Sequence, residues 1–432
     1  MRTGHVTAGS DNIRVSTIAG SGSVGGANGV GTAVTFSNAF GIAIDPSGIA
    51  YVSESAGRRV RQLVVSTGAV TTLAGSGASA STDGTGTAAA FSELFYVALD
   101  GLGNMFVCDF GAHRIRKVVL ATHAVTTVAG SGTASFADGA GTAASFNNPH
   151  GIACDVNGNA YVSDGGNNCI RKIVLSSATV TTLAGSAAPS ATNGVGTAAG
   201  FNRPSNVVVS GALLFVAEWN SHLVRQIVIA TQTVTTLAGS GTSGSANGVG
   251  VAAQFNGAHG LAVDSRGNLF VGDIGSNLIR KIVIATQTVT TVAGTGAASW
   301  ADGFGTNAAF SNPIGLAVDS RGNVFVAESG NHRVRVMQPS VPCPAGVYCA
   351  PGAEAVACTP GYFCALGADR VPCAAGYFCP SGSSAQVVCP AGAFHCPAGA
   401  SAPLSIACAA GYILFDHMLR FMLHVRLYLD FF

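Results

Sequence analysis

Six acidic residues in this 432-residue chain are each followed by an arginine seven positions later. The pairs are Glu54 and Arg61, Asp109 and Arg116, Asp164 and Arg171, Glu218 and Arg225, Asp273 and Arg280, and Glu328 and Arg335. Carboxylates that recur in this way could form a six-fold catalytic site, but a ring of six equal catalytic groups serves no single substrate. Paired charges commonly hold turns together. We therefore expect each acid to be structural, accepting hydrogen bonds from backbone amides or from the arginine of its own repeat.

A second group of candidate residues stands at one position that varies while its surroundings repeat. In chain order this position carries Phe40, Phe95, His150, Ser205, His259 and Ile314. Its two histidines could bind zinc. A catalytic zinc usually has three protein ligands and an open position, and the matching place in the first repeat is Phe40. We therefore expect no metal and no cofactor, and we expect these side chains to line a channel or to contact a ligand.

The elements that carry these residues recur with a fixed period. A glycine in a Thr-hydrophobic-Ala-Gly step recurs at intervals of 55, 55, 55, 54 and 55 residues, at Gly20, Gly75, Gly130, Gly185, Gly239 and Gly294. An Asx-Gly pair follows each step, beginning at Asn28, Asp83, Asp138, Asn193, Asn247 and Asp302. Such a period indicates one structural unit that is copied and stacked. We interpret the pairs as turns, because calcium needs several carboxylates and three of the six positions are asparagine.

Each repeat contains four short segments that are typical of β-strands. In the second repeat they are residues 95–100, 104–109, 113–120 and 124–130, which are rich in β-branched and aromatic residues and are separated by glycine-containing turn pairs. Nearly continuous hydrophobicity indicates sheets covered on both faces, as when four-stranded blades stack around an axis. The predicted fold class is therefore all-β, a six-bladed β-propeller over residues 13–338.

The number of strands predicts how the ring closes. Six sets of three inner strands are present, but the first outer strand, residues 14–19, precedes every set, and no outer strand follows the sixth set. The N-terminal strand should therefore supply the outer strand of the last blade, which leaves no blade with an open edge. Residues 1–12 are expected to be disordered.

The last repeat, FSNPIGLAVDSRGNVFVAESGNHRVR at residues 310–335, resembles the NHL repeat. Six copies in register extend this resemblance over about three quarters of the chain, which makes it more specific than one motif would be. The resemblance implies a six-bladed propeller. The fourth repeat departs from the pattern, with Asn206, Ser210 and Gly211-Ala212 in place of the usual Gly, Asp and Gly-Asn. The first turn of that blade should therefore differ.

In a propeller the first strand of each blade is innermost, so the variable position from Phe40 to Ile314 should lie at one mouth of the central channel. His150 and His259 would then face the axis from alternate blades. This arrangement is similar to the channel histidines of propellers of the peptidyl-amidating lyase type. That resemblance implies an alternative function, a metal-dependent hydrolase or lyase with its site at the channel mouth.

The resemblance to NHL propellers also implies recognition through loops at the faces of the ring. A formal net charge of +1 provides no basic surface for nucleic acid, so we expect no nucleic-acid partner. Phe136, Trp219 and Trp300 break the repeat and are candidate contacts, because aromatic residues dominate interface hot spots; capping of their own blades is the alternative. We therefore expect a non-enzymatic scaffold that binds a protein or a glycan.

Residues 339–412 form a second region with a shorter repeat, in which nine of the 12 cysteines lie. Its glycine- and proline-rich units, such as CPAGVYC, have too few apolar residues for a core, so we expect disulfides of undecided connectivity, with zinc as the alternative. The cysteines concerned are Cys343, Cys349, Cys358, Cys364, Cys373, Cys379, Cys389 and Cys396. The region resembles the ephrin-receptor-like repeats of extracellular proteins, which implies an extracellular or cell-surface location.

The start of the sequence and the lack of an Asn-x-Ser/Thr sequon argue against that location, and the end of the sequence is unusual. The opening sequence MRTGHVTAGSDN lacks the apolar stretch of a signal peptide, which is explained if the N-terminus is incomplete. Residues 413–432 are apolar but carry charges too densely for a membrane span. We interpret this segment as aberrant, from a truncated or mis-joined reading frame, with an interfacial helix as the alternative.

Overall fold

The computed structural model describes residues 13–339 and, further on, residues 347–348, 356–357, 362–363, 371–374, 377–388 and 401. Contacts divide the chain into two compact units, Met1–Pro339 and Ser340–Phe432. The predictions for residues 1–12 and 413–432 lie outside the described residues. So do those for six of the eight cysteines, Cys343, Cys349, Cys358, Cys364, Cys389 and Cys396.

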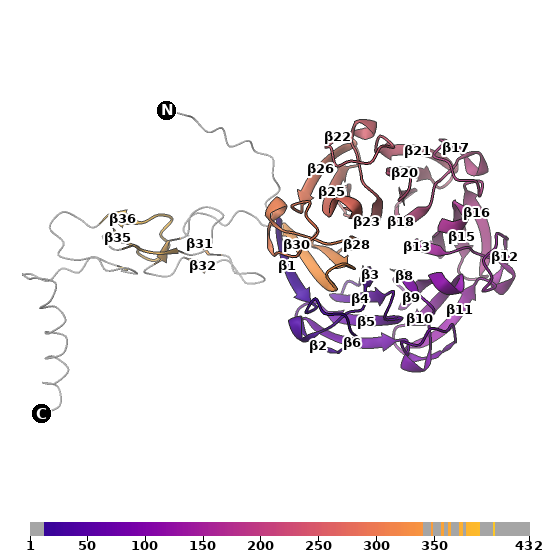
Figure 1. The fold of residues 1–432 in the computed structure, drawn as a ribbon, viewed down its shortest axis with the longest axis horizontal. Helices are drawn as coiled ribbons and strands as arrows, with labels where there is room; N and C mark the ends of the chain where they lie inside the picture. The colour runs from indigo at the N-terminus through magenta and orange to yellow at the C-terminus, as the bar shows by residue number, and fades with distance from the viewer. Residues whose placement is uncertain are drawn as a thin grey trace, which may run out of the picture. The chain divides into compact units, whose positions relative to one another are not determined.

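The first unit is a ring of six sheets, or blades, around a central axis, and each blade has five strands (Figure 1). We number the blades in the order of the repeats and give their strands from the axis outward. Blade one contains β3 (Ala39–Ile44), β4 (Ile49–Glu54), β5 (Arg59–Val64), β6 (Ala69–Ala74) and β2 (Gly29–Val30). Blade two contains β8 (Leu94–Leu99), β9 (Asn104–Asp109), β10 (Arg114–Val119), β11 (Ala124–Ala129) and β7 (Gly84–Thr85). Blade three contains β13 (Pro149–Cys154), β14 (Asn159–Asp164), β15 (Cys169–Val174), β16 (Thr179–Ala184) and β12 (Gly139–Ala140).

The remaining three blades follow the same order. Blade four contains β18 (Pro204–Ser210), β19 (Leu213–Glu218), β20 (Leu223–Val228), β21 (Thr233–Ala238) and β17 (Gly194–Val195). Blade five contains β23 (Ala258–Val263), β24 (Asn268–Asp273), β25 (Leu278–Val283), β26 (Thr288–Ala293) and β22 (Gly248–Val249). Blade six contains β28 (Pro313–Val318), β29 (Val324–Glu328), β30 (Arg333–Pro339), β1 (Ile13–Ala19) and β27 (Gly303–Phe304). The predicted all-β six-bladed propeller is therefore confirmed.

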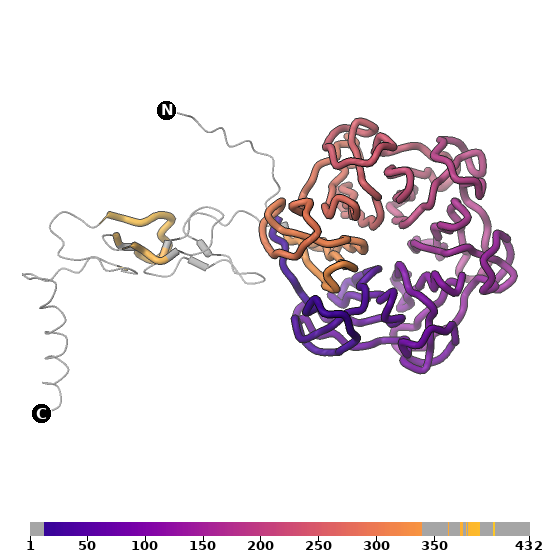
Figure 2. The backbone as a smooth tube through the Cα atoms, in the orientation of Figure 1, coloured from indigo at the N-terminus to yellow at the C-terminus, as the bar shows by residue number. Residues whose placement is uncertain are grey.

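Strand β1 closes the ring, as the strand count predicted. It pairs antiparallel with β30, with Val15 opposite Met337, and with β27 on its other side. Figures 1 and 2 show the indigo N-terminal strand beside the orange strands of blade six. Ile13 and Val15 are buried in the core of that blade, together with Met337. The two ends of the ring are thus joined by a ladder of hydrogen bonds and by a shared apolar core.

The structure adds a fifth strand to the four that were predicted for each blade. This strand is two residues long and begins at the glycine of the Asx-Gly pair. A short 3-10 helix follows this strand. The helix begins at a glycine in the left-handed region, with φ between +49° and +57°, a conformation that favours glycine. These helices are η1 (Gly31–Ala33), η2 (Gly86–Ala88), η4 (Gly141–Ala143), η6 (Gly196–Ala198), η7 (Gly250–Ala252) and η9 (Gly305–Asn307).

The core lies between neighbouring blades. One apolar cluster, for example, combines Tyr51 and Val60 of blade one with Phe91 and Met105 of blade two. The phenylalanine of each repeat is fully buried, at Phe36, Phe91, Phe146, Phe201, Phe255 and Phe310. Both faces of every sheet are therefore covered, which explains why these strands are hydrophobic along nearly their whole length.

The first turn of blade four differs from the others, as its sequence predicted. In blade one, Asp45 accepts hydrogen bonds from the backbone amides of Ser47 and Ile49, which builds a four-residue turn. Blade four has Ser210 at the aspartate position, and Ser210 pairs directly with Leu213. The turn is therefore only two residues long, and its first residue is Gly211 with φ +57°.

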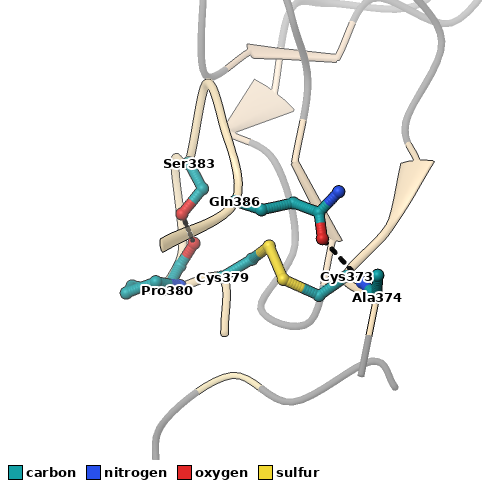
Figure 3. The surroundings of a disulfide bond; sticks show 6 residues. All are labelled: Cys373, Ala374, Cys379, Pro380, Ser383 and Gln386. Atoms are coloured by element: carbon teal, nitrogen blue, oxygen red, sulfur yellow. Dashed lines mark hydrogen bonds between the residues drawn. A yellow bond between two sulfur atoms is a disulfide. The ribbon is translucent and has the colours of Figure 1, made fainter. Parts of the chain in front are cut away.

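In the second unit, three two-stranded sheets are described: β31 (Val347–Tyr348) with β32 (Val356–Ala357), β33 (Tyr362–Phe363) with β34 (Val371–Pro372), and β35 (Tyr377–Phe378) with β36 (Val387–Val388). A disulfide joins Cys373 to Cys379 beside the last sheet (Figure 3). The backbone amide of Ala374 next to it donates to Oε1 of Gln386. The interpretation of the whole region as ephrin-receptor-like repeats stays a prediction. In the part of the chain that is described, no helix is long and apolar enough to cross a membrane.

Candidate functional site

The six acid and arginine pairs form six separate buried centres, one in each blade. Each acid ends the second strand of its blade, and each arginine lies in the third strand, so the register of the sheet brings them together. Their ion pairs measure 2.6–3.2 Å, and all twelve side chains are fully buried. Each arginine Nη2 also donates to the Asx of the turn, at 2.6–2.9 Å. These groups do not meet in a common site.

Each centre also contains the phenylalanine of its repeat. The guanidinium carbon lies 5.3–5.5 Å from the centre of that ring. In blade one, Nη1 and Nη2 of Arg61 donate in addition to the backbone carbonyls of Thr35 and Ala27. One arginine therefore ties two strands, the Asx-Gly turn and the following loop together, so each centre fixes the connection between one outer turn and its blade.

The six variable residues meet on the axis and form a plug. Every one of them is at most 8% exposed. Phe40 stacks on Phe95 with ring centres 4.1 Å apart, His150 lies 4.7 Å from Phe95, and His259 lies 5.7 Å from Phe40. Ser205 donates to backbone carbonyls of its own and the next blade.

The expectation that these side chains contact a ligand at a channel mouth stays a prediction. Their rings fill the axis, because four of the six are aromatic or imidazole groups that stack across it. Beyond the plug, a cavity of 260 Å³ continues between later residues of all six innermost strands, among them Ile42, Cys154 and Val208. The plug thus separates this cavity from the opposite face of the ring, which we call the plug face.

His259 is held inside the plug. Its Nδ1 shares a 2.6 Å hydrogen bond with the hydroxyl of Tyr96, which also donates to the carbonyl of Ile314. A Cβ at Gly260 would overlap with the carbonyl oxygen of Ile314, so glycine is required for the close approach of blades five and six. Burial lowers the pKa of His259 to about 3, and the ring is neutral.

His150 is also buried and neutral, but it has no such partner. Burial lowers its pKa well below 6.5, helped by nearby His259 and Arg203. Neither ring nitrogen has a hydrogen-bond partner among the described residues. Its neighbours are the rings of Phe95, Phe110 and His259, at 4.7, 5.0 and 5.9 Å. A buried imidazole with two unsatisfied nitrogens is costly, and such groups commonly mark functional sites.

A pocket of 370 Å³ opens on the plug face directly beside His150. Its lining comes from three blades and includes Phe110 of blade two, Asn148 and Gly165 of blade three, and Arg203 and Asn220 of blade four. Gly165 makes the opening, because a Cβ there would lie 2.8 Å from Cδ2 of His150. We call this recess the Gly165 pocket.

Phe110 and Gly165 were not predicted from the sequence, although a signal was present. Both stand directly after the acid of their repeat, a position that varies as much as the plug position does. In chain order it carries Ser55, Phe110, Gly165, Trp219, Ile274 and Ser329. A comparison of the six copies at this position would have shown one glycine between a phenylalanine and a tryptophan, and so a gap between two bulky side chains.

The three loop aromatics have different surroundings. Trp219 lies 5.5 Å from the ring of His259 and 4.6 Å from the guanidinium carbon of Arg203, so it supports one wall of the Gly165 pocket. Phe136 and Trp300 are each 46% exposed and pack on Arg171 and Arg333, at 4.9 and 4.1 Å. Neither of them lines the pocket. Of the three, only Trp219 adjoins the plug.

The described residues contain no group of three or more His, Cys, Asp or Glu side chains that could hold a metal ion. The thiols of the propeller are also poor nucleophiles. Cys108 and Cys169 are buried, and burial raises the pKa of Cys154 to about 12. The chemistry available at the pocket is therefore hydrogen bonding, cationic charge and aromatic contact.

Comparisons with known proteins agree with the propeller and its repeats. The model of the NHL repeat matches residues 146–173 and 310–337, in blades three and six, so the chain carries NHL repeats within a six-bladed propeller. It is 27% identical over 269 residues to Protein SUPPRESSOR OF QUENCHING 1, chloroplastic, of Arabidopsis thaliana, which covers 59% of this chain and 26% of that protein.

A second relative gives a similar match. Over 288 residues the chain is 27% identical to NHL repeat-containing protein 2 of Homo sapiens, covering 57% of this chain and 40% of that protein. The chain therefore spans less than half the length of these relatives. A structural genomics protein of unknown function from Bacteroides thetaiotaomicron VPI-5482 shares the fold with a TM-score of 0.58 and 21% identity, over 75% of each chain.

The neutral state of His150 predicts a pH dependence of stability. The folded protein binds no proton at this ring, whereas the unfolded chain binds one as the pH falls below 6.5. Stability is therefore lost on acidification. In the variant His150→Phe, which has the residue of blades one and two at this position, the loss between pH 7 and pH 5 should shrink by about 2 kcal/mol. Urea unfolding at both pH values measures this difference.

Exposed His123 provides the matched control, because Gln232 and Gln287 occupy its position in two other repeats with the same left-handed backbone. The variant His123→Gln should leave the pH difference of the wild-type protein in place. An unchanged pH difference in His150→Phe would show that His150 is charged in the folded protein.

Proposed function

We propose that this protein is a non-enzymatic binding scaffold that acts outside the cell or at its surface and recognises a protein or glycan through the plug face of its propeller. The observation that carries the proposal is the Gly165 pocket. There the residues that break the repeat gather beside an imidazole whose two nitrogens lack partners. The residues that repeat six times build the ring itself. A single ligand is therefore recognised by residues that differ between the repeats.

The composition of the pocket favours a glycan over a protein. Asparagine side chains at positions 148, 168, 202 and 220 line it, and each amide both donates and accepts hydrogen bonds. Phe110 adds an apolar wall. The hydroxyl groups and apolar ring faces of a sugar match such a lining. The pocket volume of 370 Å³ is at the small end of ligand pockets, which span roughly 300–1,000 Å³, so it suits a sugar better than a protein segment.

The extracellular location rests on the second unit. Its disulfide between Cys373 and Cys379 would persist in an oxidising compartment and is rare in a reducing one. The described thiols at Cys108, Cys154 and Cys169 lie in the propeller and are free.

The alternative is a metal-dependent hydrolase or lyase at the plug. The observation in its favour is the free imidazole of His150, 5.9 Å from the ring of His259. Against it, Nδ1 of His259 is bonded to Tyr96, and the other four plug residues are Phe, Phe, Ser and Ile. Nothing at this position supplies the third ligand that a catalytic zinc usually has.

A glycan array probed with the purified full chain tests the proposal. The variant Trp219→Ala removes the support of the pocket wall and should weaken binding at least about tenfold, as expected of an aromatic hot spot. Trp300→Ala, the chain's other tryptophan, is the matched control and should leave binding unchanged. Equal losses in both variants, or no bound glycan, would contradict recognition through the plug face.

The same preparation distinguishes the alternative and checks the compartment. Stoichiometric zinc that disappears when both His150 and His259 are replaced by phenylalanine would favour the enzyme. Reactive thiols at Cys373 and Cys379 in protein recovered from a secretory pathway would contradict the disulfide and with it the extracellular assignment.

A further inference from the structure

We propose that the Gly165 pocket binds one carboxylate-bearing sugar residue, of the uronic acid type, with its carboxylate on Arg203 and a hydroxyl on His150. This inference rests on the proposed function and names the class of ligand at its site. Three independent features of the pocket support it: its charge, its hydrogen-bonding groups and its shape.

The charge of the pocket is positive and uncompensated. Arg203 is exposed at the rim, and its guanidinium has no ion pair among the described residues. No aspartate or glutamate in the described part of the chain lines the pocket. The six buried arginines, by contrast, are each neutralised by an acid. A planar guanidinium binds a carboxylate through two parallel hydrogen bonds, so one carboxylate fits this charge.

Arg203 is also held in place at some cost. Its φ is +54°, in the left-handed region that residues other than glycine, asparagine and aspartate seldom adopt. Other repeats carry Asn38, Asn148 or Gly257 here, residues that tolerate the left-handed region. The ring of Trp219 lies 4.6 Å from the guanidinium carbon. A strained backbone that positions a stacked arginine at a pocket rim points to a ligand contact.

The hydrogen-bonding groups select a hydroxyl for the floor of the pocket. A neutral imidazole has one donor and one acceptor nitrogen, and a hydroxyl can satisfy either. A second negative charge would have to be buried against a ring that carries no charge, so phosphate and sulfate are less well matched than a monocarboxylate. Around the rim, Asn220 donates to Asn202, and Asn168 accepts from the backbone amide of Arg203 and donates to the carbonyl of Ala187. Each amide has a second hydrogen and a second lone pair that can pair with further hydroxyls.

The shape of the pocket provides a wall for the ring of a sugar. Phe110 is fixed by stacking on Phe95, with ring centres 4.0 Å apart and an angle of 16°. Arg203, which packs on the ring of Trp219, lines the opposite side of the pocket. Gly165 leaves open the space that phenylalanine and tryptophan fill in blades two and four. The C–H face of a pyranose can therefore lie along Phe110, with its carboxylate on Arg203 at the rim and a hydroxyl directed at the buried imidazole of His150.

Titration calorimetry of the full chain with D-glucuronate tests the inference. D-glucose, which lacks the carboxylate, and acetate, which lacks the ring, are the ligand controls and should each bind at least about tenfold more weakly. Arg203→Gln should weaken glucuronate binding at least about tenfold. Arg266→Gln, at an exposed arginine in a first turn of blade five, is the matched control and should not change it.

A second variant tests the pocket without touching the charge. Gly165→Ala places a methyl group against His150 and should abolish glucuronate binding, while its midpoint of thermal unfolding shows that the ring remains folded. Equal affinities for glucuronate and glucose, equal affinities for glucuronate and acetate, or equal effects of Arg203→Gln and Arg266→Gln would each overturn the inference.

The outcomes also separate this inference from the proposed function. Binding of neutral glycans that depends on Trp219, without binding of glucuronate, would reject the acidic sugar and leave the scaffold role intact. Arg203-dependent binding of glucuronate without any glycan bound on the array would leave the pocket intact and reject the scaffold role.

Discussion

Replacement of Arg280 by methionine should lower the free energy of unfolding by about 3–5 kcal/mol. The change removes a buried ion pair of 3.2 Å with Asp273 and the hydrogen bonds from Nη2 to Asn247 and the carbonyl of Ala246. Burial already raises the pKa of the Asp273 carboxyl, and without its arginine this group must be buried unpaired or take up a proton. Urea unfolding followed by tryptophan fluorescence measures the loss.

Two further variants make this expectation specific. Arg266→Met, at an exposed site in the same blade, should change stability by no more than about 0.5 kcal/mol. The double variant Asp273→Leu/Arg280→Met removes both charges and should recover part of the loss, since apolar replacement of a buried pair is often neutral. A single variant as stable as the wild-type protein would show that the buried centres do not stabilise the ring.

Replacement of Val15 by aspartate should lower the free energy of unfolding by about 3–5 kcal/mol as well, because it places an unpaired charge where the side chain is 1% exposed. Val15 belongs to β1, the strand that pairs with β30 and closes blade six. Ser16 is the control, since its side chain points to the other face of the same strand and is partly exposed. Ser16→Asp should cost much less.

The measurement for this second expectation is limited proteolysis combined with urea unfolding. Val15→Asp should expose the strands of blade six to a protease at concentrations of urea where the wild-type protein is resistant, because an unpaired outer strand opens the ring. Equal stability of Val15→Asp and Ser16→Asp would contradict the role of β1 in closure.

Most of the fold could be predicted because the sequence pattern of each strand recurs six times along the chain. In blade two, the predicted strands differ by no more than one residue at either end from Leu94–Leu99, Asn104–Asp109, Arg114–Val119 and Ala124–Ala129. The two-residue outermost strands could not be predicted. They are too short to show any alternation of apolar and polar residues, and their pairing depends on a turn in three dimensions.

The candidate site could be predicted only in part. Lack of repetition drew attention to the plug position, where the ring centres of His150 and His259 lie 5.9 Å apart. The plug is nevertheless closed, because the fit of Phe40 on Phe95 depends on side-chain packing across blades that no single repeat encodes. For the same reason, Trp219 could not be distinguished in advance from Trp300.

The closure of blade six by β1 also constrains the order of events during synthesis. A ribosome makes Arg333–Pro339 more than 300 residues after Ile13–Ala19, yet these two strands are partners in the finished ring. Strand β1 must therefore stay unpaired, or pair only transiently, while five complete blades emerge behind it. Its apolar residues Ile13 and Val15 lack their native partners in blade six for that whole interval, so this strand is exposed to non-native contacts unless a chaperone shields it.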